Sequence, residues 1–95
     1  MPTFEMIRKA VQDTAHMYPV RRIQLFGSYA NGTADEESDV DLLVEFSEQP
    51  ISLVKICGLQ EDLAEKLDRD VDIVKLPLPS DSDLIIGRTV DLYGT

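Results

Sequence analysis

A glycine–serine pair followed at a fixed distance by two aspartates most restricts how this chain can fold. Gly27 and Ser28 directly follow an apolar segment that ends at Phe26, and ten residues separate Ser28 from Asp39. Asp39 and Asp41 begin a second apolar segment. Residues i and i+2 of a strand project to the same face, so the two carboxylates are expected side by side. Carboxylates held this close repel each other unless a cation lies between them or one is protonated.

The glycine–serine pair has the composition of a phosphate-binding turn. A turn from a strand into a helix offers backbone N–H groups and a hydroxyl to a phosphate, and glycine lets the phosphate approach the main chain. Mg²⁺ prefers oxygen ligands and commonly completes its shell with phosphate oxygens. The stretch therefore predicts a nucleoside triphosphate site, in which Gly27 and Ser28 bind phosphates and Asp39 and Asp41 bind metal.

This spacing resembles the signature of the polymerase-β-like nucleotidyltransferase superfamily, a Gly-Ser pair, ten residues and Asp-x-Asp. The run Gly-Ser-Tyr-Ala-Asn-Gly-Thr-Ala over 27–34, in a chain of 95 residues, is similar to the minimal nucleotidyltransferases (MNT). These are the antitoxins of HEPN/MNT toxin–antitoxin pairs, and the resemblance covers nearly the whole chain. One position departs from the pattern, because family members often have arginine where this chain has Asn31. Asparagine offers only neutral donors to a phosphate or a partner.

Hydrophobic periodicity predicts the remaining elements. Apolar residues at helical spacing predict a helix over 3–17, with Phe4, Ile7, Val11 and Ala15 on its apolar side, and His16 near its end. Strands are expected over 21–26 and 39–46, a helix after Pro50 whose core-facing stripe runs from Leu53 to Leu67, and a strand over 70–75. A capping-box variant at Ser80 predicts a short helix ending at Gly87, and an edge strand follows over 89–93.

Two residues of the second long helix are interpreted as structural and not functional. Cys57 is interpreted as a small core residue, and Gly58 as a point of close packing against the sheet. Arg21 and Arg22 stand at the entry to the first strand, away from its Gly27 end, and are expected to be exposed.

A third acid is expected beside the first two. The strand–helix–strand order from 39 to 75 favours a right-handed parallel crossover, which brings the strand over 70–75 next to the strand over 39–46. In the family that the motif resembles, an acid on this strand completes a metal triad and can deprotonate the attacking hydroxyl. The Val-Asp-Ile-Val context assigns that role to Asp72 and leaves Asp70 as an exposed charge.

The charge composition restricts the classes of molecule that this protein is expected to bind. Eighteen acidic and nine basic residues give a net charge of −9, which disfavours direct nucleic-acid binding and suits a basic protein partner. Seven acids and no base lie between Asp35 and Glu48; a solvated loop explains most of them but not Asp39 and Asp41. The single cysteine excludes an internal disulfide. No apolar run reaches membrane-spanning length, so we expect a cytoplasmic protein without membrane association.

Together these observations predict one α/β (α+β) domain over residues 1–95, with a small mixed sheet of about four strands flanked by helices, the polymerase-β-like nucleotidyltransferase fold. The resemblance implies an antitoxin that transfers AMP from ATP, with two Mg²⁺ ions, to a tyrosine of a cognate HEPN ribonuclease toxin. Two alternatives stay open: a non-catalytic antitoxin that masks its toxin by binding, and an enzyme that modifies a small molecule or an RNA end.

Overall fold

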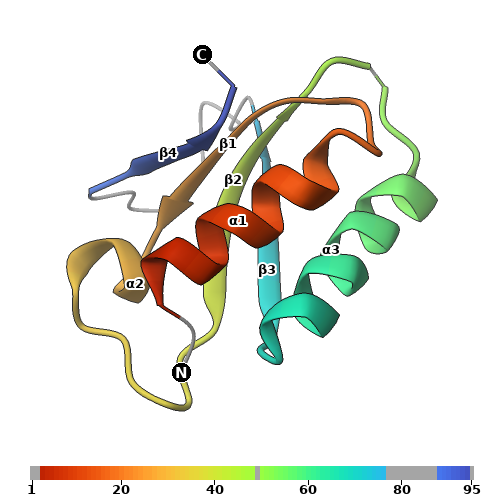
Figure 1. Cartoon of the computed structure of the whole chain (residues 1–95). Helices are drawn as coiled ribbons and strands as arrows, with labels where there is room; N and C mark the ends of the chain where they lie inside the picture. Colours follow the sequence, from red (N-terminus) through yellow and green to blue (C-terminus); the bar gives the residue numbers. More distant parts are fainter. Residues whose placement is uncertain (1–2, 49, 77–87, 95) are drawn as a thin grey trace.

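The fold is a four-stranded sheet with two long helices on one face (Figure 1). The computed structural model describes residues 3–48, 50–76 and 88–94. In chain order the elements are α1 (Phe4–Ala15), β1 (Val20–Phe26), α2 (Ser28–Asn31), β2 (Val40–Phe46), α3 (Leu53–Leu67), β3 (Val71–Leu76) and β4 (Val90–Tyr93). The helix predicted between Ser80 and Gly87 lies outside the described residues.

The strand order is β3-β2-β1-β4. β1 pairs antiparallel with both β2 and β4, whereas β2 pairs parallel with β3 through the connection that contains α3. The prediction of a small mixed sheet flanked by helices, with a parallel crossover between the second and third strands, is therefore confirmed. Helices α1 and α3 both lie over the same face of the sheet (Figure 1).

Alternation along the central strands separates a core face from an open face. Val40, Leu42 and Val44 are fully buried and belong to the hydrophobic core, together with Ile23 and Leu25 of β1. Successive strand residues point to opposite faces. The residues between them on β2, which are Asp41, Leu43 and Glu45, therefore lie on the face away from α1 and α3, which we call the open face although Leu43 is only 3% exposed.

Helix α1 begins where the sequence predicts. The Thr3 side chain accepts a hydrogen bond of 3.2 Å from the Met6 backbone N–H and caps the helix. Ile7, Val11 and Ala15 are fully buried, as the periodicity predicts, but Phe4 in the first turn is 41% exposed.

Helix α3 shows where periodicity alone fails. Leu59 and Leu63 are fully buried and Leu67 is nearly so, whereas Leu53 is 76% exposed and Cys57 is exposed. The predictions of core positions for Leu53 and Cys57 are therefore wrong. The first turn of α3 lies at the outer side of the molecule, away from the strands (Figure 1), which agrees with the exposure of Leu53 and Val54.

Gly58 packs against an aromatic residue, not against the sheet as expected. A side-chain carbon at Gly58 would lie 3.0 Å from the Tyr18 hydroxyl and 3.2 Å from its ring. The same hydroxyl donates a hydrogen bond of 2.5 Å to the Asp62 carboxylate one turn further along α3. This hydrogen bond, with burial and the negative charge of Asp62, raises the pKa of Tyr18 to about 12. The contact joins the turn after α1 to the middle of α3.

Candidate active site

The Gly27–Gly32 turn follows β1 without a gap. Gly27 has φ 75° and ψ −151°, a conformation that disfavours residues with a side chain, and it lets the chain turn from β1 into the four-residue helix α2. The Asn31 N–H donates to the Gly27 carbonyl at 3.0 Å, and the Thr33 N–H donates to the Ser28 carbonyl at 2.9 Å. The predicted order of strand end, tight turn and short helical turn is confirmed, and Asn31 is exposed.

The loop between α2 and β2 is held by its own polar groups. The Asp35 carboxylate accepts from the Glu37 N–H at 2.9 Å and from the Ser38 hydroxyl at 3.1 Å. These hydrogen bonds lower the pKa of Asp35 below its ordinary value, and the bond from the Glu37 N–H has the largest effect. The loop therefore delivers the chain to Asp39 through a defined turn.

Asp41 and Asp72 are opposite partners across the parallel pair β2–β3. Val40 and Val71 beside them are buried in the core, so both aspartates project to the open face of the sheet. A hydrogen bond of 2.9 Å from the Val40 N–H to the Asp70 carbonyl fixes the start of this register. The sheet therefore places the third predicted acid next to the second.

The electrostatics agree with a shared carboxylate site. Asp41 is half-buried, whereas Asp39 and Asp72 are exposed. Burial, then the charge of Asp72, then that of Asp39, raises the pKa of Asp41 above its ordinary value. Asp41 thus experiences the negative charge of both other acids, which is the arrangement that a divalent cation would relieve.

Gly27 lies directly against the Asp41 carboxylate. β1 and β2 pair so that Phe26 is opposite Asp41, and this register brings the next residue beside the aspartate side chain. A carbon added at Gly27 would overlap the Asp41 Oδ2 atom and lie 3.1 Å from Cγ. The phosphate-binding turn and the metal-binding carboxylate predicted from sequence are therefore in van der Waals contact.

The donor set suits a hard divalent cation. Three carboxylates from β2, β3 and the residue preceding β2 offer only oxygen ligands, which is the preference of Mg²⁺. Burial is the main cause of the raised pKa of Asp41, and the charges of Asp72 and Asp39 add to it. Within residues 3–48, 50–76 and 88–94, however, no three acidic, histidine or cysteine side chains converge into a ready-made metal cluster.

An acidic groove adjoins the candidate site. It encloses about 450 Å³ and connects Asp39 to the end of α3 and the turn before β3. Its lining residues are Glu36, Glu37, Asp39, Ala64, Glu65, Asp68, Arg69 and Asp70. The charge run before β2 and the strand context of Asp70 predict exposed positions for Glu36, Glu37 and Asp70, but they do not predict that these residues lie close to Glu65 and Asp68. That grouping depends on the parallel crossover, and no local spacing announces it.

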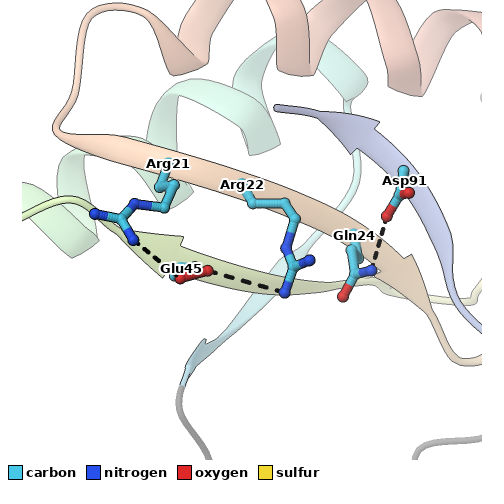
Figure 2. A network of polar contacts seen from close by, with 5 residues as sticks. All are labelled: Arg21, Arg22, Gln24, Glu45 and Asp91. Carbon is cyan, nitrogen blue, oxygen red and sulfur yellow. Dashed lines mark hydrogen bonds and ion pairs between the residues drawn. The ribbon is translucent and has the colours of Figure 1, made fainter. Parts of the chain in front are cut away.

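The opposite end of the open face carries a second polar network, shown in Figure 2. The Glu45 carboxylate is 3.7 Å from Arg21 Nη1 and 3.8 Å from Arg22 Nη2, and Gln24 donates to Asp91 at 2.7 Å. Both arginines therefore lie far along β1 from Gly27, as predicted, although Arg22 is half-buried.

In the part of the chain that the structure describes, no helix is both long and apolar enough to cross a membrane.

Comparison with known proteins relates both the sequence and the fold to one group. The family model for the nucleotidyltransferase domain matches residues 7–92. Protein adenylyltransferase MntA of Thermococcus cleftensis is 51% identical over 57 residues, which are 60% of this chain and 57% of that protein. A Methanocaldococcus jannaschii protein with the provisional name of protein adenylyltransferase MJ0126 is 39% identical over 70 residues, 74% of this chain and 70% of that one.

Solved structures show the same architecture. A toxin–antitoxin structure with AMP-PNP superposes with a TM-score of 0.70 at 32% identity, over 96% of this chain and 73% of that chain. Another describes a tri-AMPylated Shewanella oneidensis HEPN toxin in complex with an MNT antitoxin. Its TM-score is 0.67 at 25% identity, over 96% of this chain and 72% of that chain.

Proposed function

Because this chain belongs to the nucleotidyltransferase domain family, we propose that it is an antitoxin that transfers AMP from ATP to a tyrosine of a cognate HEPN toxin. The observation that carries the proposal is that Gly27, Asp41 and Asp72 lie side by side across one end of the sheet. There, Asp41 faces Asp72 on β3 and contacts Gly27 of the turn after β1. The groups that we propose to bind phosphate and cation are thus adjacent, as a nucleoside triphosphate substrate requires.

The proposed reaction is a displacement at the α-phosphorus of ATP. The tyrosine oxygen forms a bond to this phosphorus, the bond to the bridging oxygen of the β-phosphate breaks, and pyrophosphate leaves. Asp72 accepts the proton of the attacking hydroxyl, while Gly27 and Ser28 hold the leaving phosphates. Positioning of this kind and neutralisation of charge account for most of the catalysis of such transfers.

Asp39, Asp41 and Asp72 would hold the divalent ions. When bound, Mg²⁺ supplies charge neutralisation on the phosphates and lowers the pKa of the acceptor hydroxyl. The exposed position of Asp39 and Asp72 leaves these carboxylates accessible to a nucleotide–metal complex. The half-buried Asp41 is the anchor of the set, since β1 and β3 flank it on both sides.

The toxin as acceptor is supported by the neighbouring structures and by charge. Both of the solved structures described above are toxin–antitoxin structures, and one of them contains an AMPylated HEPN toxin. The net charge of −9 and the acidic groove beside Asp39 suit a basic partner. We expect a hetero-oligomer with the toxin in the cytoplasm, without direct binding of nucleic acid.

The decisive experiment incubates the protein with Mg²⁺, ATP labelled at the α-phosphate and the product of the adjacent gene. Transfer predicts label on a tyrosine of that protein, no transfer by Asp39→Asn, Asp41→Asn or Asp72→Asn, and full transfer by the control Asp91→Asn. Inhibition of the toxin without label would establish masking by binding instead. Label on an RNA end or a small molecule in place of the protein would reassign the acceptor, and activity in Asp41→Asn would refute the site.

A further inference from the structure

A side chain at position 27 would meet the carboxylate of Asp41, a candidate cation ligand, as well as the space where a phosphate would bind. An added side-chain carbon there would overlap Asp41 Oδ2 and stand 3.1 Å from Cγ and 3.3 Å from Cβ. Three atoms of one side chain thus lie across the glycine. The carboxylate occupies the volume that any other residue at position 27 would need.

The strands on both sides fix Asp41 in this place. Its backbone is paired with Phe26 on one side and with Asp72 on the other. Val40 and Leu42 on either side of it are fully buried. The backbone of Asp41 therefore cannot retreat from position 27 without disturbing the core, so a side chain there must displace the carboxylate itself.

We propose that Gly27 is a positioning residue for the Asp41 carboxylate. Because Gly27 has no side chain, it leaves space for this carboxylate to point toward the turn over residues 27–32. The proposal rests on the assignment of Asp41 as a cation ligand. It adds that glycine is required at position 27 for the carboxylate as well as for the backbone conformation. Replacement of Gly27 is therefore expected to weaken cation binding in the absence of any nucleotide.

Gly32 provides a matched control. Its φ of 74° is nearly the same as the 75° of Gly27, but an added carbon at Gly32 has no neighbour within 4 Å among the residues that the structure describes. Gly32→Ala therefore reports the cost of a side chain at positive φ in open space. The ψ of Gly27 lies in a region that is less tolerant of side chains, so a second comparison must separate the backbone from the carboxylate.

A double-mutant cycle on the unfolding equilibrium makes that separation. Gly27→Ala is compared in the native background and in Asp41→Ala, by denaturant unfolding with a chelator present. Gly27→Ala should lower the folding equilibrium constant of the native protein. We expect this fold reduction to be about ten times smaller in the Asp41→Ala background, which is the scale of relieved overpacking. Equal lowering in both backgrounds overturns the proposal. If Gly27→Ala does not fold, folding of the double variant supports the proposal and its failure to fold overturns it.

The second readout is binding of Mn²⁺, a paramagnetic substitute for Mg²⁺, to the nucleotide-free protein. Broadening of backbone amide signals at 40–42 and 71–73 measures the dissociation constant for Mn²⁺. We expect this constant to rise by about tenfold or more in Gly27→Ala, in line with the loss of one oriented carboxylate ligand, and to be unchanged in Gly32→Ala. An unchanged constant in a folded Gly27→Ala overturns the positioning role. Neither readout requires transfer activity, so the proposed reaction and this inference can fail separately.

Discussion

Replacing Asp41 with asparagine should make the cation-free protein more stable while abolishing its proposed activity. The side chain keeps its shape but loses the negative charge that burial, Asp72 and Asp39 all disfavour. The change therefore removes an unfavourable interaction from the folded state, whereas in the unfolded chain the same charge is solvated.

The size of the effect follows from the strand geometry. Neighbouring strands place Asp41 and Asp72 about 5 Å apart, and Asp39 is about 7 Å away along the chain. At the dielectric constant of water these repulsions are about 0.8 and about 0.6 kcal/mol. Because Asp39 and Asp72 are exposed, screening by salt reduces the sum to about 1 kcal/mol. For a domain of this size, that gain raises the melting temperature by roughly 4–8 °C.

The assay is thermal unfolding with a chelator, followed by circular dichroism over a range of pH. Since the folded state raises the pKa of Asp41 above its ordinary value of 3.8, the stability that its protonated form contributes is fully present below that value. This contribution is lost as the pH rises through the raised value. The native protein and Asp41→Asn should therefore be equally stable in acid, and the variant should gain as the pH increases toward neutrality.

Two controls decide whether the reasoning holds. Asp91→Asn removes one charge from β4 and keeps the oxygen that Gln24 bonds, so it reports general relief of the net charge and should give less than half of the gain. Addition of Mg²⁺ should stabilise the native protein but not Asp41→Asn. An Asp41→Asn variant that is no more stable than the native protein at neutral pH would refute the assignment of repulsion at this site.

The contact between Tyr18 and α3 gives two further predictions. Tyr18→Phe removes the 2.5 Å hydrogen bond to Asp62 and should cost about 1–2 kcal/mol of unfolding free energy at neutral pH. Because the folded pKa of Tyr18 is raised to about 12, this stabilisation is fully present below its ordinary value of 10.0 and lost as the pH rises through the raised one, which denaturant unfolding at several pH values measures. Gly58→Ala should fail to stabilise α3 in the native background, because the new carbon lies 3.0 Å from the Tyr18 hydroxyl. In a Tyr18→Ala background it should stabilise the protein by about 1 kcal/mol, the ordinary helix propensity difference; a stabilising Gly58→Ala in the native protein would contradict the packing argument.

Much of the fold could be predicted from sequence because apolar residues recur at every second position on one face of the central strands, although Leu43 and Phe26 on the other face are buried as well. Val40, Leu42 and Val44 identify the core face of β2, and the same alternation places Asp41 on the other face. The strand–helix–strand order predicts that the strand over 70–75 lies beside it, and the family resemblance selects Asp72 on that strand, which the observed register places opposite Asp41. These inferences depend on local periodicity and on the handedness of crossovers, which sequence carries directly.

The rest depends on where neighbouring elements end. Helical spacing identified the stripe that contains Leu59 and Leu63, but it could not indicate that Leu53 in the first turn is exposed. For Gly58, the partner is Tyr18 from forty residues earlier, and nothing in the local sequence names it. The contact of Gly27 with Asp41 was likewise hidden, since it arises from the antiparallel register of β1 and β2.

The alternation of β2 has a consequence for the fidelity of folding. A shift of one residue in the pairing of this strand would turn Asp41 toward the helices and Leu42 outward. Burial of an unpaired carboxylate under α1 and α3 would cost several kcal/mol, which a small domain cannot tolerate. The acids assigned to chemistry therefore also exclude the mispaired sheet, and a variant that neutralises them would lose a safeguard against register error along with its activity.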